Sequence, residues 1–434
     1  MITDAVKINR FQISNFGECK ITSPMNKNTP FETDDSQILY ERDTLKLYRH
    51  YENNGNISAF EKAGPREKIF FDPAWCKAAI LTAGGLCPGL NNVIKSLTET
   101  LKNTYGVPVV YGIPYGYAGL NPACGYSPVI LDTHTVDGLH EDGGTILGSS
   151  RGNQDPVVML ETLVRMGVNL LFCIGGDGTL RAAHLIAEEA MKRKLNISVV
   201  GIPKTIDNDI NFVPKSFGFD TAVDVATNAL RCAHTEAIGA PYGVGLVKLM
   251  GRESGFIAAS STLSLNVVNF VLVPESPFKL EGEGGLLPAL EKRLLERSHA
   301  VIVAAEGAGQ DLLTASGKTD ASGNLVLGDI GSFLQKAIKN YFAAKDMNVT
   351  VKYIDPSYIV RSMPANTNDR VYCGQLGRNA VHAAMAGKTN MVIARMQDRF
   401  VHLPLQLVTR RRRKIDITSN YWRSVIATTG QKLA

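Results

Sequence analysis

The sequence lacks the patterns that indicate a disulfide-stabilised, zinc-binding or membrane-spanning protein. It has seven cysteines, an odd number, and no two of them form a Cys-X-X-Cys motif. Neither a disulfide framework nor a structural zinc site is therefore indicated, and we expect a reducing compartment. The chain has no run of about 18 apolar residues and does not open as a signal peptide, which predicts a soluble protein with no membrane partner.

Charge and histidine content exclude further classes. The formal net charge is only +5 and most basic residues are scattered, so nucleic acid is not an expected partner. The eight histidines show no ligand spacing, and no Ser-His-Asp pattern is evident. The main basic cluster, residues 410–414, is interpreted as a solvated face. An anionic effector site, a subunit contact and a nuclear address are the alternatives.

What the sequence does contain is a globular composition. The chain has 434 residues, of which 44% are hydrophobic and 20% charged, and it includes 40 glycines. This length suits two or three domains of roughly 100–200 residues each. Residues 1–72 are more polar than the rest, and we interpret them as an N-terminal arm or a small accessory domain.

A unit of strand, polar loop and helix recurs from residue 73 onward. Apolar runs that predict strands lie at 78–82, 170–174, 198–202, 242–249, 269–273, 300–304 and 349–354, and a helix is expected over 90–104. Uninterrupted apolar runs are typical of parallel strands that are buried on both faces. We therefore predict an α/β fold with two Rossmann-like parallel-sheet domains facing a central cleft, preceded by an N-terminal extension.

The motif Gly175-Gly176-Asp177-Gly178-Thr179 lies between an expected strand and an expected helix. Glycines let backbone N–H groups approach phosphate oxygens, and the N-terminus of a helix favours anions. Asp177 is a candidate Mg²⁺ ligand, because Mg²⁺ is commonly held by one or two carboxylates together with substrate phosphates. The alternative is a tight turn with an aspartate cap. Several kinase classes, including lipid and NAD kinases, use this motif, so it predicts phosphoryl transfer without naming the acceptor.

The most specific feature is the segment Pro203-Lys204-Thr205-Ile206-Asp207-Asn208-Asp209. It places two carboxylates two positions apart, after a lysine, beyond a buried strand. One carboxylate would act as general base on an acceptor hydroxyl, and the other would support a metal or the lysine. An ordinary Asn/Asp turn is the alternative, but the position after a buried strand favours catalysis.

Two further segments offer donors to a phosphate group. Met250-Gly251-Arg252 ends an expected strand, and arginine matches the geometry of a phosphoryl group. Lys352, Tyr358 and Arg361 together supply the several donors that a phosphate monoester needs. The alternatives are a capped turn with a surface Arg–Glu pair and an ordinary exposed strand and loop.

Taken together, these motifs resemble the 6-phosphofructokinase family over roughly residues 78–399. The resemblance rests on Gly84-Gly85, Pro88-Gly89, Gly148-Ser149-Ser150-Arg151, Gly175 to Thr179, Pro203 to Asp209, Met250-Gly251-Arg252, Glu306, and Tyr358 with Arg361. It implies that fructose 6-phosphate and a phosphoryl donor give fructose 1,6-bisphosphate. It also implies a homo-oligomer, expected to be a tetramer, in the cytoplasm, with an organelle such as a glycosome left open.

The resemblance divides the chain and assigns roles. An ATP-binding domain is expected at 73–212 with 387–419, and a fructose 6-phosphate-binding domain at 213–386 with 420–434. Asp207 resembles the base that takes the proton of the sugar 1-hydroxyl, with Lys204, Thr205 and Asp209 beside it, and Asp177 resembles the Mg²⁺ ligand. The expected donor-site residues are Gly85, Arg151, Gly152, Gly178 and Thr179. On the acceptor side, Arg252 would stabilise the moving phosphoryl group, Met250, Gly251 and Glu306 would contact the sugar, and Lys352, Tyr358 and Arg361 would hold the 6-phosphate.

The donor is inferred from two positions. Lys204 is similar to the pyrophosphate-using members, but these usually have aspartate where this chain has Gly178. An aspartate there would crowd and repel the α-phosphate of a nucleotide. The pair Gly178 and Lys204 resembles the ATP-dependent subgroup of plants and trypanosomatids, so ATP with Mg²⁺ is expected. A pyrophosphate-dependent enzyme is the alternative, and a non-catalytic sugar-phosphate sensor is a distant one. Gly243 stands where bacterial members have an arginine from a neighbouring subunit, so their effector control is not carried over.

Overall fold

The computed structural model describes residues 7–314, 317–319 and 325–433. It forms two compact units: unit 1 comprises Met1–Thr205, Ile210–Phe217 and Thr367–Arg411, and unit 2 comprises Ile206–Asp209, Gly218–Asn366 and Arg412–Ala434. The predicted domains were defined by their ligands and stay predictions. The compact units differ from them chiefly because the helix α10 (Thr367–Met385) packs against α2 (Leu90–Glu99) of unit 1.

The main sheet of unit 1 has seven strands, and its central strands are parallel. Their order is β18 (Arg399–Pro404), β17 (Met391–Met396), β11 (Ser198–Pro203), β10 (Leu170–Gly175), β7 (Lys77–Ala83), β8 (Val109–Ile113) and β9 (Val129–Ile130). Only the edge strands β9 and β18 pair antiparallel within this sheet. Every residue of β10 and β11 is buried, as expected for uninterrupted apolar strands covered on both faces.

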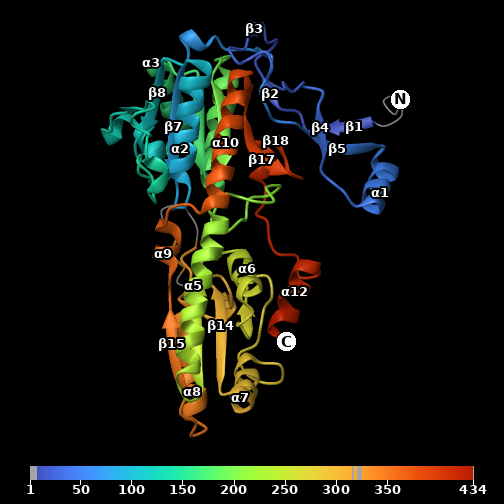
Figure 1. Cartoon of the computed structure of the whole chain (residues 1–434), viewed down its shortest axis with the longest axis vertical. Helices are drawn as coiled ribbons and strands as arrows, with labels where there is room; N and C mark the ends of the chain where they lie inside the picture. Colours follow the sequence, from blue (N-terminus) through green and yellow to red (C-terminus); the bar gives the residue numbers. More distant parts are fainter. Residues whose placement is uncertain (1–6, 315–316, 320–324, 434) are drawn as a thin grey trace. The chain divides into compact units, whose positions relative to one another are not determined.

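Helices cover both faces of this sheet. They are η1 (Pro73–Trp75), α2, the π-helical turn η2 (Thr100–Tyr105), η3 (Gly116–Leu120), η4 (Pro122–Cys124), η5 (Leu139–Glu141), α3 (Pro156–Met166), α4 (Asp177–Lys192), α10 and α11 (Leu405–Val408). On one face, α3 and α4 share a hydrophobic core with Ala79 and Leu81 of β7. α2 and α10 pack on each other, where the Ser96 hydroxyl donates to the Gly374 carbonyl at 2.7 Å (Figure 1).

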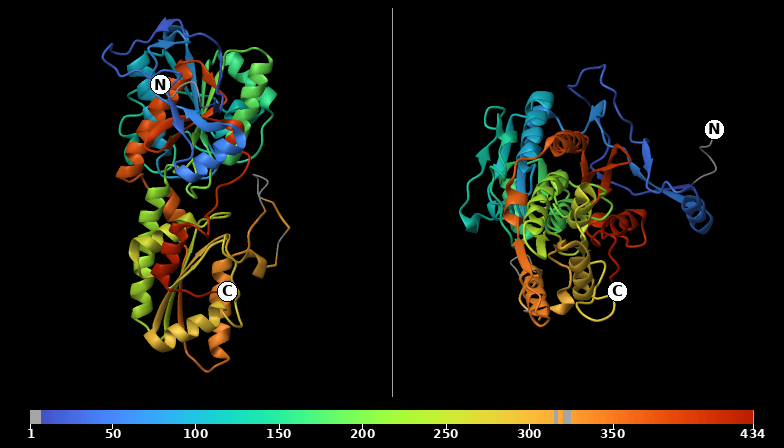
Figure 2. Two further views of the ribbon diagram at one scale, coloured as in Figure 1. Left: turned by 90° about the vertical axis from the view of Figure 1, so that its right-hand side faces the viewer. Right: turned by 60° about the horizontal axis from the view of Figure 1, so that its bottom comes forward.

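The N-terminal segment is part of unit 1. Its elements are β1 (Lys7–Arg10), β2 (Ser14–Asn15), β3 (Ile21–Thr22), β4 (Gln37–Leu39), α1 (Thr44–Asn54), β5 (Asn56–Glu61) and β6 (Lys68–Ile69). β2 pairs with β16 (Lys388–Thr389), and the segment lies beside the red strands β17 and β18 in Figure 2. The Glu61 carboxylate lies 2.9 Å from Arg66, 3.1 Å from Lys388 and 3.0 Å from the ring of His402. Buried ion contacts thus join this segment to the far end of the chain.

Unit 2 is built on a fully parallel four-stranded sheet in the order β13 (Phe270–Leu272), β14 (His299–Ala305), β12 (Gly243–Leu249) and β15 (Thr350–Ile354). Its helices are α5 (Phe219–Ile238), α6 (Phe256–Leu265), α7 (Leu286–Arg297), η6 (Gln310–Leu312), α8 (Ile330–Ala343), α9 (Ser357–Ser362) and α12 (Asn420–Thr429). α7 and α8 share a core with alternate residues of β14, while α5 and α6 pack together (Figure 1). The α/β prediction and the predicted strands are confirmed in both units.

Two general features accompany this fold. The seven cysteines all lie in the described part of the chain, and none of them forms a disulfide. None of the described helices is both long and apolar enough to span a bilayer.

Candidate functional site

Three predicted motifs of unit 1 leave its sheet side by side. In the parallel register, Ala83 at the end of β7 pairs with Gly175 of β10, which in turn pairs with Pro203 of β11. The loops that begin at Gly84, Gly176 and Lys204 therefore start at the same level of the same sheet edge. This is the carboxyl edge, where open α/β sheets bind ligands.

Lys204 joins these loops. Its backbone N–H donates to the Gly175 carbonyl at 3.0 Å, and its ammonium donates to the Gly85 carbonyl at 2.7 Å. The side chain is only 6% exposed, so a fixed positive charge lies beside the two glycine loops. Such a charge is suited to an anion that enters between them.

Arg151 and Gly152 lie on the loop next to Gly85. The Gly84 N–H donates to the Ser150 carbonyl at 3.1 Å, which ties the two loops together. A Cβ atom added to Gly85 would lie 3.6 Å from a terminal nitrogen of Arg151. Arg151 itself is exposed, and its side chain lies beside the glycine loop.

The start of α4 combines a fixed backbone with open space. The Tyr117 hydroxyl donates to the Thr179 carbonyl at 2.7 Å, and a Cβ atom on Gly175 would overlap the Thr179 hydroxyl at 2.2 Å. Gly178 is the opposite case, because an added Cβ would have no atom within 4 Å. The first N–H groups of α4 have no partner within their own helix, so this open space is suited to a phosphate.

Asp177 stands in the first turn of α4, where its carboxylate pairs with Arg181. Among the described residues there is no group of three or more His, Cys, Asp or Glu side chains that would hold a metal alone. A single carboxylate still fits Mg²⁺, since this ion takes most of its ligands from phosphate oxygens and water. Asp177 therefore remains the candidate ligand.

In unit 2, the predicted sugar-site residues begin where two parallel strands end. Leu249 of β12 pairs with Ala305 of β14, and the Glu306 N–H donates to the Leu249 carbonyl at 2.8 Å. Burial raises the pKa of the Glu306 carboxyl, while the positive charges of Arg252 and Lys248 act in the opposite direction. Met250 follows β12 directly. Arg252 therefore lies close enough to Glu306 for its charge to act on the Glu306 carboxyl.

Gly251 is required by its backbone. Its φ of +131° lies in a region that favours glycine, and an added Cβ would lie 2.4 Å from the Ser254 carbonyl oxygen. The Gly307 N–H donates to the Gly251 carbonyl at 3.0 Å. The loop that carries Arg252 is therefore held against the loop that carries Glu306.

Sequence reasoning missed a charged cluster at the same strand ends. The Lys248 ammonium lies 2.9 Å from the Asp355 carboxylate and 3.2 Å from the Asp329 carboxylate. Burial disfavours ionised Asp329, but the Ser332 hydroxyl and Lys248 outweigh burial and lower the pKa of Asp329 to about 2. The signal in the sequence was a single lysine in the otherwise apolar strand β12.

The predicted phosphate-binding residues fall into two groups. Tyr358 and Arg361 both lie on α9, where the Arg361 guanidinium carbon is 4.6 Å from the centre of the Tyr358 ring. Lys352 lies on β15 and its ammonium is 3.6 Å from the Glu236 carboxylate of α5. Successive strand residues point to opposite faces, so Lys352 faces away from the side on which Tyr353 donates to Asp329 at 3.3 Å.

The two predicted carboxylates lie in the short segment Ile206–Asp209, which belongs to unit 2. The Ser254 hydroxyl donates to the Asp207 carbonyl at 3.2 Å, and Ser254 is buried. Asn208 has a φ of +56°, a left-handed turn that separates the two aspartates. Thr205, the preceding residue, is the last residue of its segment of unit 1. Asp207 therefore lies beside the loop that carries Arg252.

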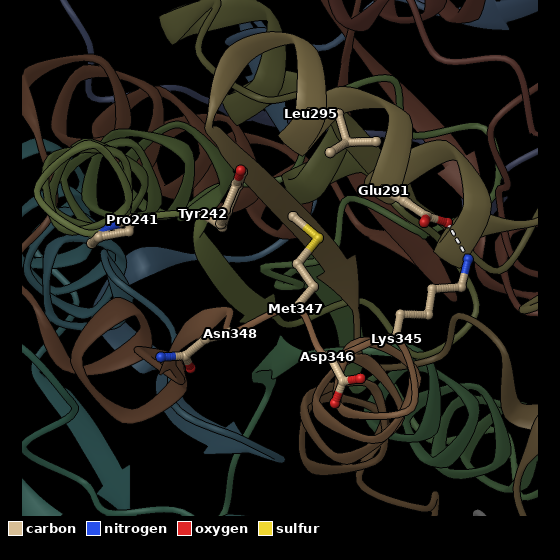
Figure 3. A pocket seen from close by; sticks show the side chains of 8 residues that line it. All are labelled: Pro241, Tyr242, Glu291, Leu295, Lys345, Asp346, Met347 and Asn348. Atoms are coloured by element: carbon tan, nitrogen blue, oxygen red, sulfur yellow. Dashed lines mark hydrogen bonds and ion pairs between the residues drawn. The ribbon is translucent and has the colours of Figure 1, made fainter.

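A hollow of about 500 Å³ lies elsewhere in unit 2, lined by α7 and by the chain before β12 and β15 (Figure 3). Tyr242 and Asn348 line it, and the strands begin at Gly243 and Thr350, so it lies at the amino ends of the strands. Glu291 and Lys345 pair with each other there at 2.5 Å. None of the predicted site residues lines it, and we assign it no part of the chemistry.

Comparison with known sequences agrees with these motifs. The family model described as Phosphofructokinase matches residues 77–384. ATP-dependent 6-phosphofructokinase of Borreliella burgdorferi is 50% identical over 98% of this chain and 97% of its own length. ATP-dependent 6-phosphofructokinase 1 of Arabidopsis thaliana is 44% identical, covering 94% of this chain and 87% of its own. ATP-dependent 6-phosphofructokinase of Trypanosoma brucei brucei is 46% identical, covering 84% of this chain and 75% of its own length.

Solved structures show the same fold at lower identity. A pyrophosphate-dependent phosphofructokinase from Marinobacter aquaeolei matches with a TM-score of 0.66 at 20% identity, covering 82% of this chain and 92% of its own. A Pichia pastoris phosphofructokinase in the T-state matches with a TM-score of 0.64 at 19% identity, covering 93% and 46%.

Proposed function

Because the chain belongs to the phosphofructokinase family, we propose that it is an ATP-dependent 6-phosphofructokinase. It transfers the γ-phosphoryl group of ATP to the 1-hydroxyl of fructose 6-phosphate and yields fructose 1,6-bisphosphate. The observation that carries ATP as the donor is the open space at Gly178, at the start of α4. Relatives at 44–50% identity that carry the name ATP-dependent 6-phosphofructokinase support the same donor.

On the donor side, glycines and fixed cations bind the phosphates. The N–H groups at the start of α4 and the loop at Gly85 approach the phosphate oxygens, and Lys204 and Arg151 balance their charge. Gly152 and Thr179 complete this loop surface. Bound Mg²⁺ would neutralise further charge on the phosphate oxygens, and Asp177 is the residue that would hold it.

On the acceptor side, Asp207 accepts the proton of the attacking 1-hydroxyl as general base, and Asp209 and Thr205 flank it. Arg252 stabilises negative charge on the phosphoryl group as it moves. Glu306, Met250 and Gly251 orient the sugar. These groups bring the hydroxyl and the phosphoryl group into line, which accounts for most of the catalysis in phosphoryl transfer.

Tyr358 and Arg361 bind the 6-phosphate, because they offer adjacent hydroxyl and guanidinium donors on one short helix. Lys352 pairs with Glu236 of α5 and would have to leave this partner to bind the 6-phosphate. We also propose that the chain forms a homotetramer. Sedimentation analysis of the purified chain tests the tetramer. The proposed cytoplasmic location, with a glycosome-like organelle as the alternative, is tested by imaging the tagged chain.

The experiment that tests the function measures turnover of fructose 6-phosphate with Mg²⁺ and either ATP or pyrophosphate, side by side. We expect turnover with ATP and none with pyrophosphate. Turnover with pyrophosphate alone would retain the family and show that Lys204 outweighs Gly178 as the donor signal. Absence of turnover with both donors would favour the sugar-phosphate sensor.

A further inference from the structure

The basic run at residues 410–414 has no role in the function proposed above. The structure divides its members into two kinds. Arg410, Arg411 and Lys414 are exposed, whereas Arg412 and Arg413 are partly buried within unit 2. A solvated face explains the exposed residues of the run, but it does not explain the partly buried Arg412 and Arg413.

Arg412 and Arg413 contact the segment that carries the two aspartates. The Arg413 N–H donates to the Asp209 carbonyl at 2.7 Å, and the Arg413 guanidinium donates to the Asn208 carbonyl at 3.1 Å. The Arg412 guanidinium lies 3.5 Å from the Asp209 carboxylate. Two consecutive carbonyls and one carboxylate of this segment are therefore bound from one short stretch of chain.

The same two arginines also contact the chain around Arg252. The Arg412 guanidinium lies 3.3 Å from the Glu253 carboxylate, and the Arg413 guanidinium carbon lies 4.3 Å from the centre of the Phe256 ring. A guanidinium over an aromatic face is attracted by the ring and is fixed in orientation. Each arginine thus joins the segment 206–209 to the segment 251–256.

Glu275 reinforces this junction from a third direction. Its carboxylate accepts the Ile415 N–H at 2.8 Å and the Gly255 N–H at 3.0 Å, so the chain after Arg413 is tied to the residue before α6. Glu275 itself is partly buried. Hydrogen bonds and ion pairs therefore join three segments into one network, namely 206–209, 251–256 and 412–415.

We propose that Arg412 and Arg413 are positioning residues for phosphoryl transfer, which hold the segment of the base Asp207 against the segment of Arg252. This inference rests on the proposed function, because it takes Asp207 as the base and Arg252 as the stabiliser of the phosphoryl group. Neither arginine touches the reacting atoms in this role. Both fix the distance and the angle between a group that acts on the attacking hydroxyl and a group that acts on the phosphoryl group.

The left-handed turn at Asn208 explains why the contact matters. A φ of +56° is an uncommon conformation for a residue other than glycine, and it directs the two aspartates on either side. The Arg413 guanidinium binds the carbonyl of this residue, and the Arg413 N–H binds the next carbonyl. A displacement of about 1 Å at a reacting group costs on the order of 100-fold in rate, so loss of this contact acts on turnover.

The test compares Arg413→Met and Arg413→Lys with wild type in steady-state turnover of ATP and fructose 6-phosphate. Methionine keeps an apolar stem over Phe256 and the backbone N–H that donates to Asp209, but it removes every side-chain donor and the charge. We expect Arg413→Met to lower kcat by roughly 10- to 100-fold, while the KM values for both substrates change by less than about threefold. Arg413→Lys retains the charge and an ammonium group that can donate, and we expect it to recover part of the lost kcat.

Matched controls come from the same run. Arg410→Met and Arg411→Met each remove one exposed charge of the cluster, and we expect both to keep wild-type kcat and KM. Arg412→Met removes the guanidinium that contacts both the Asp209 and the Glu253 carboxylates. It should also lower kcat and leave the KM values nearly unchanged. If Arg413→Met does not fold, Arg412→Met and Arg413→Lys test the proposal by the same criterion, a lowered kcat with nearly unchanged KM values.

Two results would overturn the proposal. One is a kcat within twofold of wild type for folded Arg413→Met and Arg412→Met. The other is a loss of kcat that equals the loss of folded enzyme, measured by thermal unfolding in the same samples. An inactive wild-type enzyme would instead refute the proposed function itself, so the two failures are distinguishable.

Discussion

The sheet edges of the two units present different kinds of chemistry at equivalent positions. At the ends of β7 and β10, unit 1 presents glycines, open space at Gly178 and the start of a helix. At the ends of β12, β14 and β15, unit 2 presents long charged side chains, among them Lys248, Arg252 and Glu306. Both edges lie at the carboxyl ends of parallel strands, where open α/β sheets bind their ligands.

The difference reflects what each edge would bind. A chain of phosphates needs many N–H groups at short range, and only glycines let the backbone come so close. A sugar phosphate offers hydroxyls and one monoester, which side chains distinguish by charge and hydrogen bonding. Substitutions in unit 1 should therefore act on the space and the charge next to the phosphates, and substitutions in unit 2 on the pairing of charged side chains.

The largest effect is expected at the base. Asp207→Asn keeps the shape of the side chain but removes its ability to accept a proton, so kcat should fall by about 100- to 10,000-fold. Affinity for fructose 6-phosphate should change little, because an amide retains the hydrogen-bonding shape. Steady-state kinetics with ATP check both values, and retained turnover would refute the base assignment.

Gly178→Asp tests whether open space selects the donor. The added carboxylate would lie near the nucleotide phosphates, and like charges brought together in this way cost several kcal/mol, or roughly 100-fold or more in kcat/KM for ATP. The KM for fructose 6-phosphate should stay within about twofold to threefold, since the sugar residues lie in other loops.

Gly178→Asn is the control for Gly178→Asp, because it adds nearly the same bulk without the charge. Its loss of kcat/KM for ATP should be clearly smaller. Since an added Cβ contacts nothing within 4 Å, neither variant should lower the Tm. Equal ATP kinetics in Gly178→Asp and wild type would contradict the argument from space and charge.

Lys248→Met tests the charged edge of unit 2. It would leave the Asp329 and Asp355 carboxylates without the ammonium that lies within 3.2 Å of both. Breaking a fully buried ion pair costs about 3–5 kcal/mol, and these carboxylates are partly exposed, so we expect about 1–2 kcal/mol in the free energy of unfolding. Urea unfolding of the variant and wild type measures this difference.

Lys345→Met serves as the control for Lys248→Met. Its ammonium also pairs with a carboxylate, that of Glu291, but its side chain is 42% exposed. Solvent screens exposed pairs so that they contribute little, and the unfolding free energy of this variant should be close to that of wild type. Equal losses of unfolding free energy in Lys248→Met and Lys345→Met would show that the Lys248 cluster stabilises the fold no more than an exposed ion pair does.

The smallest expected effect is a dependence of stability on pH. Folding lowers the pKa of Asp329 from its ordinary value of 3.8 to about 2. A lowered carboxyl pKa adds stability above the unfolded value, and this stability is lost as the pH falls from about 4 toward about 2. In Asp329→Asn, which keeps a good helix cap, the Tm should fall less steeply over this range. Curves of Tm against pH that run parallel for the variant and wild type would contradict the lowered pKa of Asp329.

The strands and the glycine motifs could be predicted from the sequence because their signals are local. The apolar runs at 170–174 and 198–202 became β10 and β11 almost residue for residue. Burial on both faces demands an uninterrupted apolar sequence, and that demand is visible in a window of a few residues. The polar N-terminal segment gave no such signal, since its attachment depends on Glu61 and on Lys388 and His402 near the other end of the chain.

The sequence by itself determined the family motifs, the parallel α/β architecture and the absence of a side chain at Gly178. Only the tertiary structure decided which charges meet: Lys248 with Asp329 and Asp355, and Arg413 with Asn208, which is 205 positions away in the chain. The physical reason is that backbone pattern and turn chemistry act between neighbours. Ion pairs and hydrogen bonds between side chains act only at short distance in space, and folding alone sets that distance.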